Sequence, residues 1–178
     1  MQAMLRRTGR RNAQAGMSLI ELMIAGVVLV IGFAGVMVLM IAAVSSNGRN
    51  KKDTTAATVA QMVLERIQTL PEGSTTTTTV TDCAGNTWTI DSAAGGANVS
   101  NGAVDFTQAY SGVPANFKMQ YVVCDATGQQ TTYDVRWNIA AATTHTTFVI
   151  IGARPTAAVS GNLQLFALPV TIRAMVGQ

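Results

Sequence analysis

The sequence contains an apolar segment that is long enough to cross a membrane. From Met17 to Val44 the only charged residue is Glu21. Residues Leu22 to Val44 supply 23 uncharged positions, whereas a helix needs about 20 apolar residues to span the hydrocarbon core of a bilayer. A typical signal-peptide core has only about 7–15 apolar residues. The segment is therefore predicted to stay in the protein as a transmembrane helix.

Glu21 is an expensive residue at the head of such a helix. A carboxylate at the bilayer centre costs at least about 2.5 kcal/mol unless a partner compensates its charge. One hypothesis is that a protease cuts after Gly16, and that the new amine of Met17, or that of a neighbouring subunit, pairs with Glu21. Such a pair would fix the register between helices. The alternative is that Glu21 lies close enough to the cytoplasmic interface to reach water.

The positive charge of the chain is concentrated at its beginning. The net charge is +3, but residues 1–16 hold four arginines and no acid, so the rest of the chain sums to about −1. Basic residues that flank an apolar segment favour the cytoplasmic side. The sequence therefore predicts a basic leader at 1–16. It gives no sign of nucleic-acid binding, for which basic residues are interleaved with aromatic ones.

A second helical pattern follows the apolar segment. Five apolar residues recur at intervals of four and three and so share one helical face: Ala56, Ala60, Val63, Ile67 and Leu70. Pro71 and Gly73 then end the pattern. The sequence thus predicts one helix over residues 17–70, transmembrane at 22–44 and amphipathic in its second half.

The remainder of the chain, residues 71–178, changes to a β pattern. Runs rich in Thr, Val, Ile and aromatic residues predict strands at Thr75–Val80, Thr87–Ile90, Phe117–Cys124, Thr131–Ile139, Thr146–Ile151 and Leu163–Ala174. Ser92 to Gly102 is predicted to be a loop, and Pro169 is expected to place the last strand at an edge or a bend. The predicted fold class is α+β, a long N-terminal helix packed against a C-terminal antiparallel β-sheet domain.

One predicted strand alternates in polarity along its length. Its apolar residues are Tyr133, Val135, Trp137 and Ile139, and its polar residues are Thr132, Asp134, Arg136 and Asn138. This alternation predicts one buried face and one face in water. The amphipathic helix face is the expected cover of the buried side.

The residue content does not predict an enzyme. Cys83 and Cys124 are the only cysteines, and in an oxidising compartment they are expected to form one disulfide. The single histidine, His145, has no partner pattern for a metal site. The aspartates are interpreted as turn formers and surface charges: Asp82, Asp91, Asp105, Asp125 and Asp134. Trp88 and Trp137 are interpreted as core residues. No catalytic, cofactor-binding or metal-binding set is predicted.

Residues 16–21 resemble the processing site of type IV prepilins and the related pseudopilins. The family pattern is a basic leader ending in Gly, a cleavage point, usually Phe, then Thr-Leu-Ile-Glu and an apolar helix. This chain reads Gly16-Met17-Ser18-Leu19-Ile20-Glu21, with Met in place of Phe and Ser in place of Thr. A weaker likeness, in Ile31-Gly32-Phe33-Ala34-Gly35 and in residues 133–139, is to PilV-type minor prepilins.

The resemblance implies how the chain is processed and where it goes. A prepilin peptidase would cut between Gly16 and Met17, the Met17 amine would be methylated, and Glu21 would recognise the amine of a neighbouring subunit. The implied partners are other major and minor pilins, through the N-terminal helix, and an inner-membrane assembly platform. The implied location is the bacterial inner membrane, single-pass with a periplasmic C-terminal domain, and afterwards the pilus or pseudopilus.

The favoured function is a minor type IV pilin that primes or caps filament assembly. Two features depart from major pilins: Cys83 and Cys124 enclose the middle of the chain, and no proline occurs between Leu22 and Val44. One alternative is a minor pseudopilin of a type II secretion system, which shares the N-terminal pattern. The other is a secreted or membrane-tethered β-domain binding protein whose ordinary export signal, cut after Ala43-Val44-Ser45, leaves Ser46 as the first residue.

Overall fold

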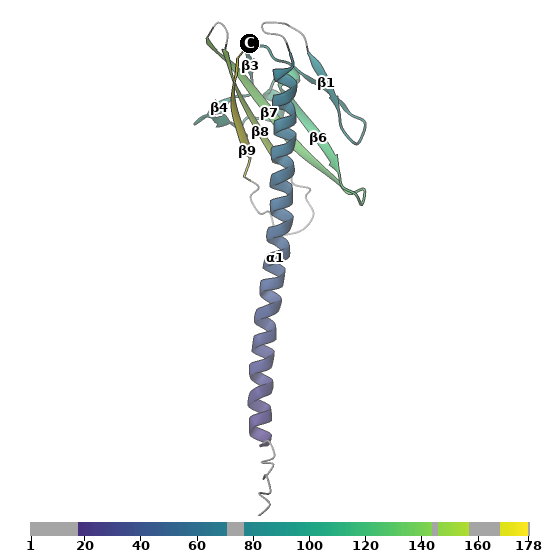
Figure 1. Ribbon diagram of the computed structural model, residues 1–178, viewed down its shortest axis with the longest axis vertical. Helices are drawn as coiled ribbons and strands as arrows, with labels where there is room; N and C mark the ends of the chain where they lie inside the picture. The colour runs from purple at the N-terminus through teal and green to yellow at the C-terminus, as the bar shows by residue number, and fades with distance from the viewer. Residues whose placement is uncertain (1–17, 71–76, 144–145, 157–167, 178) are drawn as a thin grey trace, which may run out of the picture. The chain divides into compact units, whose positions relative to one another are not determined.

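The computed structural model describes residues 18–70, 77–143, 146–156 and 168–177. The chain divides into two compact units, Met1–Ser45 and Ser46–Gln178. Helix α1, Leu19–Gln68, contributes residues to both units (Figure 1). Its 50 residues agree with the predicted N-terminal helix, although the helix ends two residues before Leu70.

In the first unit, the described part of α1 is apolar and exposed. Its large apolar side chains from Leu19 to Val44 have between 56% and 77% of their surface accessible. Continuous apolar surface of this extent is rare on proteins that remain in water. Helix α1 is also long and apolar enough to cross a membrane. These properties agree with the predicted membrane anchor.

In the second unit, α1 changes to a helix with one buried face. The buried residues are Ala56, Val59, Ala60, Val63 and Ile67. Val59 widens the predicted stripe, because a helix on a sheet buries more than a single row of side chains. Leu70, predicted to belong to this face, follows the end of the helix and is only partly buried.

The described residues form nine strands in three antiparallel sheets. The strands are β1 (Thr78–Thr81), β2 (Thr87–Ile90), β3 (Gly95–Gly96), β4 (Val99–Ser100), β5 (Ala103–Val104), β6 (Lys118–Cys124), β7 (Gln130–Thr143), β8 (Thr146–Pro155) and β9 (Val170–Gly177). The main sheet has the order β3-β7-β8-β9, and β6 also pairs with β7. The pairs β1-β2 and β4-β5 form two small sheets.

Most of the predicted strands are present, and one predicted loop is wrong. Strand β2 has the predicted bounds, and β6, β7 and β8 overlap their predictions. The stretch Ser92 to Gly102, predicted to be a loop, contains β3 and β4. Its two-residue strands are too short to give a periodic signal. Strand β9 begins directly after Pro169 and lies at the edge of the main sheet, as the proline predicts, whereas residues 163–167 lie outside the described residues.

The core of the second unit lies between α1 and the inner face of the main sheet. The inward residues of β7 are the four that the alternation predicts, Tyr133, Val135, Trp137 and Ile139, and each is at most 2% exposed. They form one cluster with the buried face of α1. Figure 1 shows this part of α1 crossing the strands of the main sheet. Trp137 is thus a core residue as predicted, while Trp88 is only partly buried.

Two hairpin turns of the same design stand at the ends of β1 and β6. In residues 82–86 and 125–129 the first residue is Asp, and its Oδ1 accepts hydrogen bonds from the backbone N–H groups two and four residues later, at 2.8–3.0 Å. The fourth residue is Gly85 in one turn and Gly128 in the other, with φ of 85° and 80°. Glycine fits there because its backbone adopts positive φ at no steric cost.

A disulfide between Cys83 and Cys124 joins these two hairpins, in agreement with the predicted pairing. The two Cα atoms are 5.9 Å apart, and the residues are separated by 41 positions in the chain. The backbone N–H of Cys83 also donates to the carbonyl of Val122 at 3.4 Å. The small β1-β2 sheet is therefore attached covalently to the main sheet through β6.

We expect the double variant Cys83→Ser/Cys124→Ser to fold with reduced stability. Opening a loop of this length lowers the free energy of unfolding by about 4 kcal/mol in the chain-entropy treatment. The measurement is urea unfolding of the full-length protein in detergent, followed by far-UV circular dichroism. Peptide mapping of the unreduced wild type should recover Cys83 linked to Cys124, and free thiols in exported protein would contradict the pairing.

Candidate functional site

The predicted assembly residue, Glu21, lies in the first turn of α1. Its backbone N–H donates to the carbonyl of Ser18 at 3.0 Å, so the residue belongs to the opening turn of the helix. A carboxylate is favourable there, because the N-terminal end of a helix carries partial positive charge. Gly16 and Met17, the predicted cleavage residues, lie outside the described residues.

Glu21 is the only charged residue in the described part of its unit, residues 18–45. Its neighbours Leu19, Ile20 and Leu22 are apolar and mostly exposed, and the next charged residue along α1 is Arg49, in the other unit. Among the described residues no ion pair is formed by Glu21. Within the apolar part of a membrane such a carboxylate would attract a cation strongly, because little solvent would screen the two charges. The carboxylate is therefore an acceptor for a cationic group.

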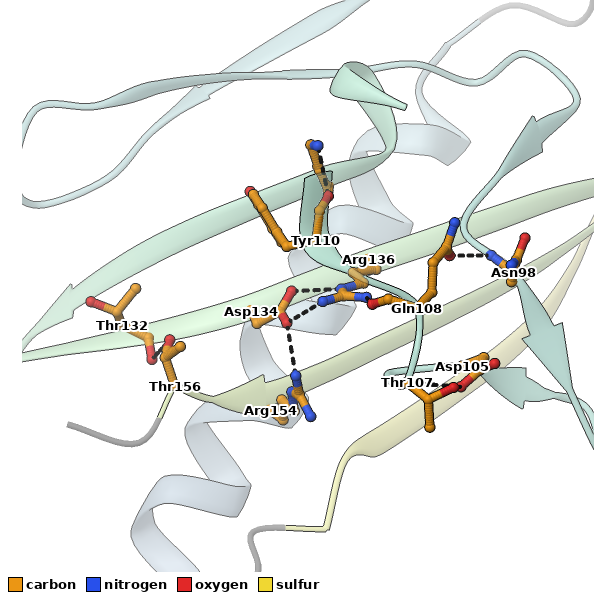
Figure 2. A network of polar contacts seen from close by, with 11 residues as sticks. Asn98, Asp105, Thr107, Gln108, Tyr110, Thr132, Asp134, Arg136, Arg154 and Thr156 are labelled. Carbon is orange, nitrogen blue, oxygen red and sulfur yellow. Dashed lines mark hydrogen bonds and ion pairs between the residues drawn. The ribbon is translucent and has the colours of Figure 1, made fainter. Parts of the chain in front are cut away.

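The second candidate site is a polar network on the outer face of the main sheet, opposite the α1 core (Figure 2). Asp134 accepts two hydrogen bonds from Arg136, at 2.9 Å from Nε and 2.8 Å from Nη2. Arg136 Nη1 donates to the carbonyl of Gln108 at 2.7 Å, and Arg154 Nη2 reaches Asp134 at 3.3 Å. Each of the three guanidinium nitrogens of Arg136 therefore donates one hydrogen bond.

The prediction that this face of β7 lies in water is wrong for its charged residues. Asp134 is 3% exposed and Arg136 2% exposed. The segment after β5 covers them, and Phe106 lies so close over Gly152 that a Cβ atom there would come within 2.8 Å of its ring. Glycine on β8 thus makes room for the cover, and the bidentate pair makes the burial of two charges tolerable.

Cations and aromatic rings alternate across this site. Arg136 lies 5.0 Å from the centroid of Phe106 and 5.5 Å from that of Tyr110. Arg154 lies 4.5 Å from Phe106, and the Lys118 ammonium lies 4.7 Å from Tyr110. We call these five residues the cation–aromatic ladder. Each contact of this kind contributes about 0.5–2 kcal/mol, depending on its exposure to solvent.

The Tyr110 hydroxyl does not offer acid–base chemistry near neutral pH. Burial, together with the negative charge of Asp134, raises its pKa to about 12, although Arg136 acts in the opposite direction. A phenol with this pKa stays protonated under ordinary conditions. The ring therefore contributes its face to the ladder and no base to a reaction.

Asp82, like Asp134, is buried, although both are interpreted from the sequence as turn formers or surface charges. In addition to its own turn, it accepts hydrogen bonds from Trp88 Nε1 and from the backbone N–H of Val122, both at 3.2 Å. Burial raises its pKa, but hydrogen bonds from Asn86, Trp88 and Val122 outweigh it and lower the pKa to about 2. Asp105 and Asp125, by contrast, are only half-buried and accept exposed hydrogen bonds within turns, as predicted for turn formers.

The described residues contain no cluster of three or more His, Cys, Asp or Glu side chains that could hold a metal ion. His145, for which the sequence predicts no metal site, lies outside them. Asp91, also interpreted as a turn former, accepts a hydrogen bond from the N–H of Ala93 at 2.9 Å.

The outer-face network is what sequence reasoning missed. The signal was present in the pattern itself, because Asp134 and Arg136 are two residues apart on a strand and so share a face at pairing distance. What the pattern lacks is any indication that a segment 28 residues earlier, ending in Gln108, returns to cover them.

No family model, curated protein or solved structure matches the chain.

The two matched turns give a test of the Asp82 network. A pKa lowered to about 2 means that Asp82 adds stability above pH 4, where the unfolded carboxyl is also ionised, and loses it as the pH falls toward 2. Asp82→Asn should lower the free energy of unfolding at pH 6 by about 2 kcal/mol and flatten its fall between pH 4 and 2.

Asp125→Asn is the control, because it changes a turn of the same design at a half-buried position whose hydrogen bonds are exposed. It should alter both quantities less, in urea titrations at pH 6, 4 and 3. Equal effects of the two substitutions would show that the additional bonds from Trp88 and Val122 do not matter.

Proposed function

We propose that this chain is a minor type IV pilin, a structural subunit that primes or caps assembly of a pilus filament. The observation that supports this most directly is Glu21, the single charge of the exposed apolar part of α1. The resemblance of residues 16–21 to a prepilin processing site supplies the partner of that charge. The β-rich second unit would be the part carried on the surface of the filament.

The chemistry of assembly would follow from cleavage after Gly16. Hydrolysis of that peptide bond adds water and leaves a carboxylate on Gly16 and an amine on Met17. At neutral pH the amine is cationic, and methylation keeps its charge. Glu21 of one subunit would then bind the amine of the next, which relieves the cost of a carboxylate in apolar surroundings. The ion pair is stronger there than in water and fixes the axial register between helices.

The exposed apolar surface of α1 needs a cover in each stage of this cycle. In the first unit the large apolar side chains from Leu19 to Val44 are all exposed in the single chain. Lipid would cover them before assembly, and helices of other subunits afterwards. Helices pack against one another through close van der Waals contacts both in a membrane and in a filament, and the glycines Gly26, Gly32 and Gly35 permit such contacts.

One observation favours a second candidate, a secreted β-domain binding protein. The boundary between the two compact units falls between Ser45 and Ser46, which is where an ordinary signal peptidase would cut after Ala43-Val44-Ser45. Cleavage there would release the second unit with its buried α1 face intact. The two candidates therefore differ in the first residue of the mature protein.

Mass spectrometry of the mature N-terminus separates the two candidates. The pilin proposal expects an N-terminal peptide that begins at methylated Met17, because only that amine lies one helical turn before Glu21. The protein should be isolated from membranes and from sheared filaments. A mature chain beginning at Ser46 would refute the pilin proposal and favour the secreted domain.

Glu21→Ala tests the assembly step itself. The variant should stay in the membrane, since it removes a charge from an apolar helix, but its amount in sheared filaments should fall at least about tenfold because the incoming amine loses its partner. Immunoblots of membrane and filament fractions measure both quantities. Glu65→Ala, which removes an exposed acid from the same helix in the second unit, is the matched control and should assemble normally. Normal incorporation of Glu21→Ala would contradict the pairing.

A further inference from the structure

All basic residues of the β-rich part share one face of the main sheet. After Arg66 the sequence contains four of them: Lys118, Arg136, Arg154 and Arg173. On β7, Arg136 is opposite both Lys118 and Gly152, and Arg154 is two residues after Gly152. On β9, Arg173 is opposite Ile150, which is two residues before Gly152. Because residues alternate between faces along a strand, all four lie on the outer face, which we call the cationic face.

The cationic face keeps a surplus of positive charge. Asp134 neutralises Arg136 and also contacts Arg154. Asp105, in the covering segment, interacts with Arg136 at longer range. Two carboxylates thus stand against four cations on the described part of this face. The fold does not require this extra positive charge, because the charges of the buried ion pair between Asp134 and Arg136 already balance.

Two of the four cations are open to another molecule. The Arg154 side chain is 37% exposed and uses only Nη2 in its contact with Asp134. Arg173 is exposed and lies against the backbone of Gly102, where a Cβ atom would come within 3.2 Å of the guanidinium. The register places the two residues about four positions apart along the strands, which is about 13 Å.

We propose that the cationic face binds an acidic segment of another polypeptide, whose carboxylates pair with Arg154 and Arg173. The planar guanidinium matches a carboxylate with two parallel hydrogen bonds. In an extended segment, side chains four residues apart on one face are also about 13 Å apart, so such a partner reaches both arginines without bending. This inference concerns the second unit alone and holds whether or not the chain joins a filament.

The position of Arg173 favours an extended partner. Strand β9 is the last strand of the main sheet, and within the described residues it pairs only with β8. A sheet edge offers backbone N–H and C=O groups to an added strand, and side-chain contacts then supply the selectivity. A basic side chain in the middle of the edge discourages pairing with a second, equally basic copy and favours an acidic segment.

Nucleic acid is disfavoured by the aromatic rings of the same site. Binding of single strands needs ring faces on which bases can stack. The Phe106 ring already contacts Arg136 and Arg154, and the Tyr110 ring contacts Arg136 and Lys118, with the cations 4.5–5.5 Å from the ring centroids. The rings therefore hold the arginines in place and leave few faces for bases.

The test is binding of fluorescein-labelled poly-L-glutamate, about 20 residues long, to the full-length protein in a neutral detergent. Fluorescence anisotropy at low and high salt should show binding that weakens as salt rises, because the contacts are partly exposed. Arg154→Glu/Arg173→Glu should weaken binding at least about tenfold, from the loss of two pairs and the gain of two repulsions. Lys52→Glu/Arg66→Glu, with the same change in net charge on exposed positions of α1, is the control and should bind like the wild type.

A single variant keeps the test valid if the double variant misfolds. Arg173→Glu removes an exposed side chain without an ion pair among the described residues, so it should fold normally by circular dichroism and still bind about fivefold more weakly. Three results would overturn the proposal: no binding of poly-L-glutamate at low salt, equal weakening by the α1 control, or tighter binding of a single-stranded oligonucleotide of equal charge that depends on the same arginines.

Discussion

The middle of strand β7, from Tyr133 to Trp137, is buried on both faces, and the rest of the second unit is arranged around it. On the inner face Val135 and Trp137 are fully buried against the apolar side of α1. On the outer face Asp134 and Arg136 are buried as an ion pair. Apolar burial on the first face stabilises the fold by about 25 cal/mol for each Å² removed from water, whereas the ion pair does little more than balance its own desolvation. The inner face therefore supplies stability, and the outer face supplies a defined arrangement of charge.

That arrangement depends on the segment between β5 and β6. Phe106 and Tyr110 hold Arg136 between them, and the carbonyl of Gln108 accepts a hydrogen bond from Nη1, the nitrogen that does not bond Asp134. A guanidinium that is fixed on every side cannot turn toward solvent, so it also fixes the position of Asp134. Arg154 then has one contact to the same carboxylate and keeps its other donors available. The buried network thus also restricts the position of Arg154, a cation that is still partly exposed.

Local periodicity predicted the inner face, and tertiary contacts decided the outer one. The stripe from Ala56 to Ile67 and the alternation from Tyr133 to Ile139 are properties of neighbouring residues, so the sequence contains them in readable form. Helix α1 also continues through its polar stretch, where the hydroxyls of Thr54 and Thr55 donate to carbonyls four residues earlier. The burial of Asp82 and Arg136 depends on Val122 and Gln108, which are 40 and 28 residues away. A local pattern does not predict contacts between residues so far apart in the sequence. The two-residue strands β3 and β4 are likewise not predictable from a local pattern.

The two candidate sites share one physical property: each holds charge that the described residues of its own unit do not neutralise. Glu21 is an anion in apolar surroundings without an ion pair in the described residues, and the cationic face holds more guanidinium than carboxylate. Charges left in this state cost stability in an isolated chain, and the cost disappears when a second chain brings the opposite charge. Because the two sites have opposite sign and lie in different units, the two proposals assign them different partners: a cationic chain terminus for Glu21, and acidic side chains for the outer face. A chain built to remain alone would gain stability from an apolar residue at position 21 and from one more carboxylate near Arg173.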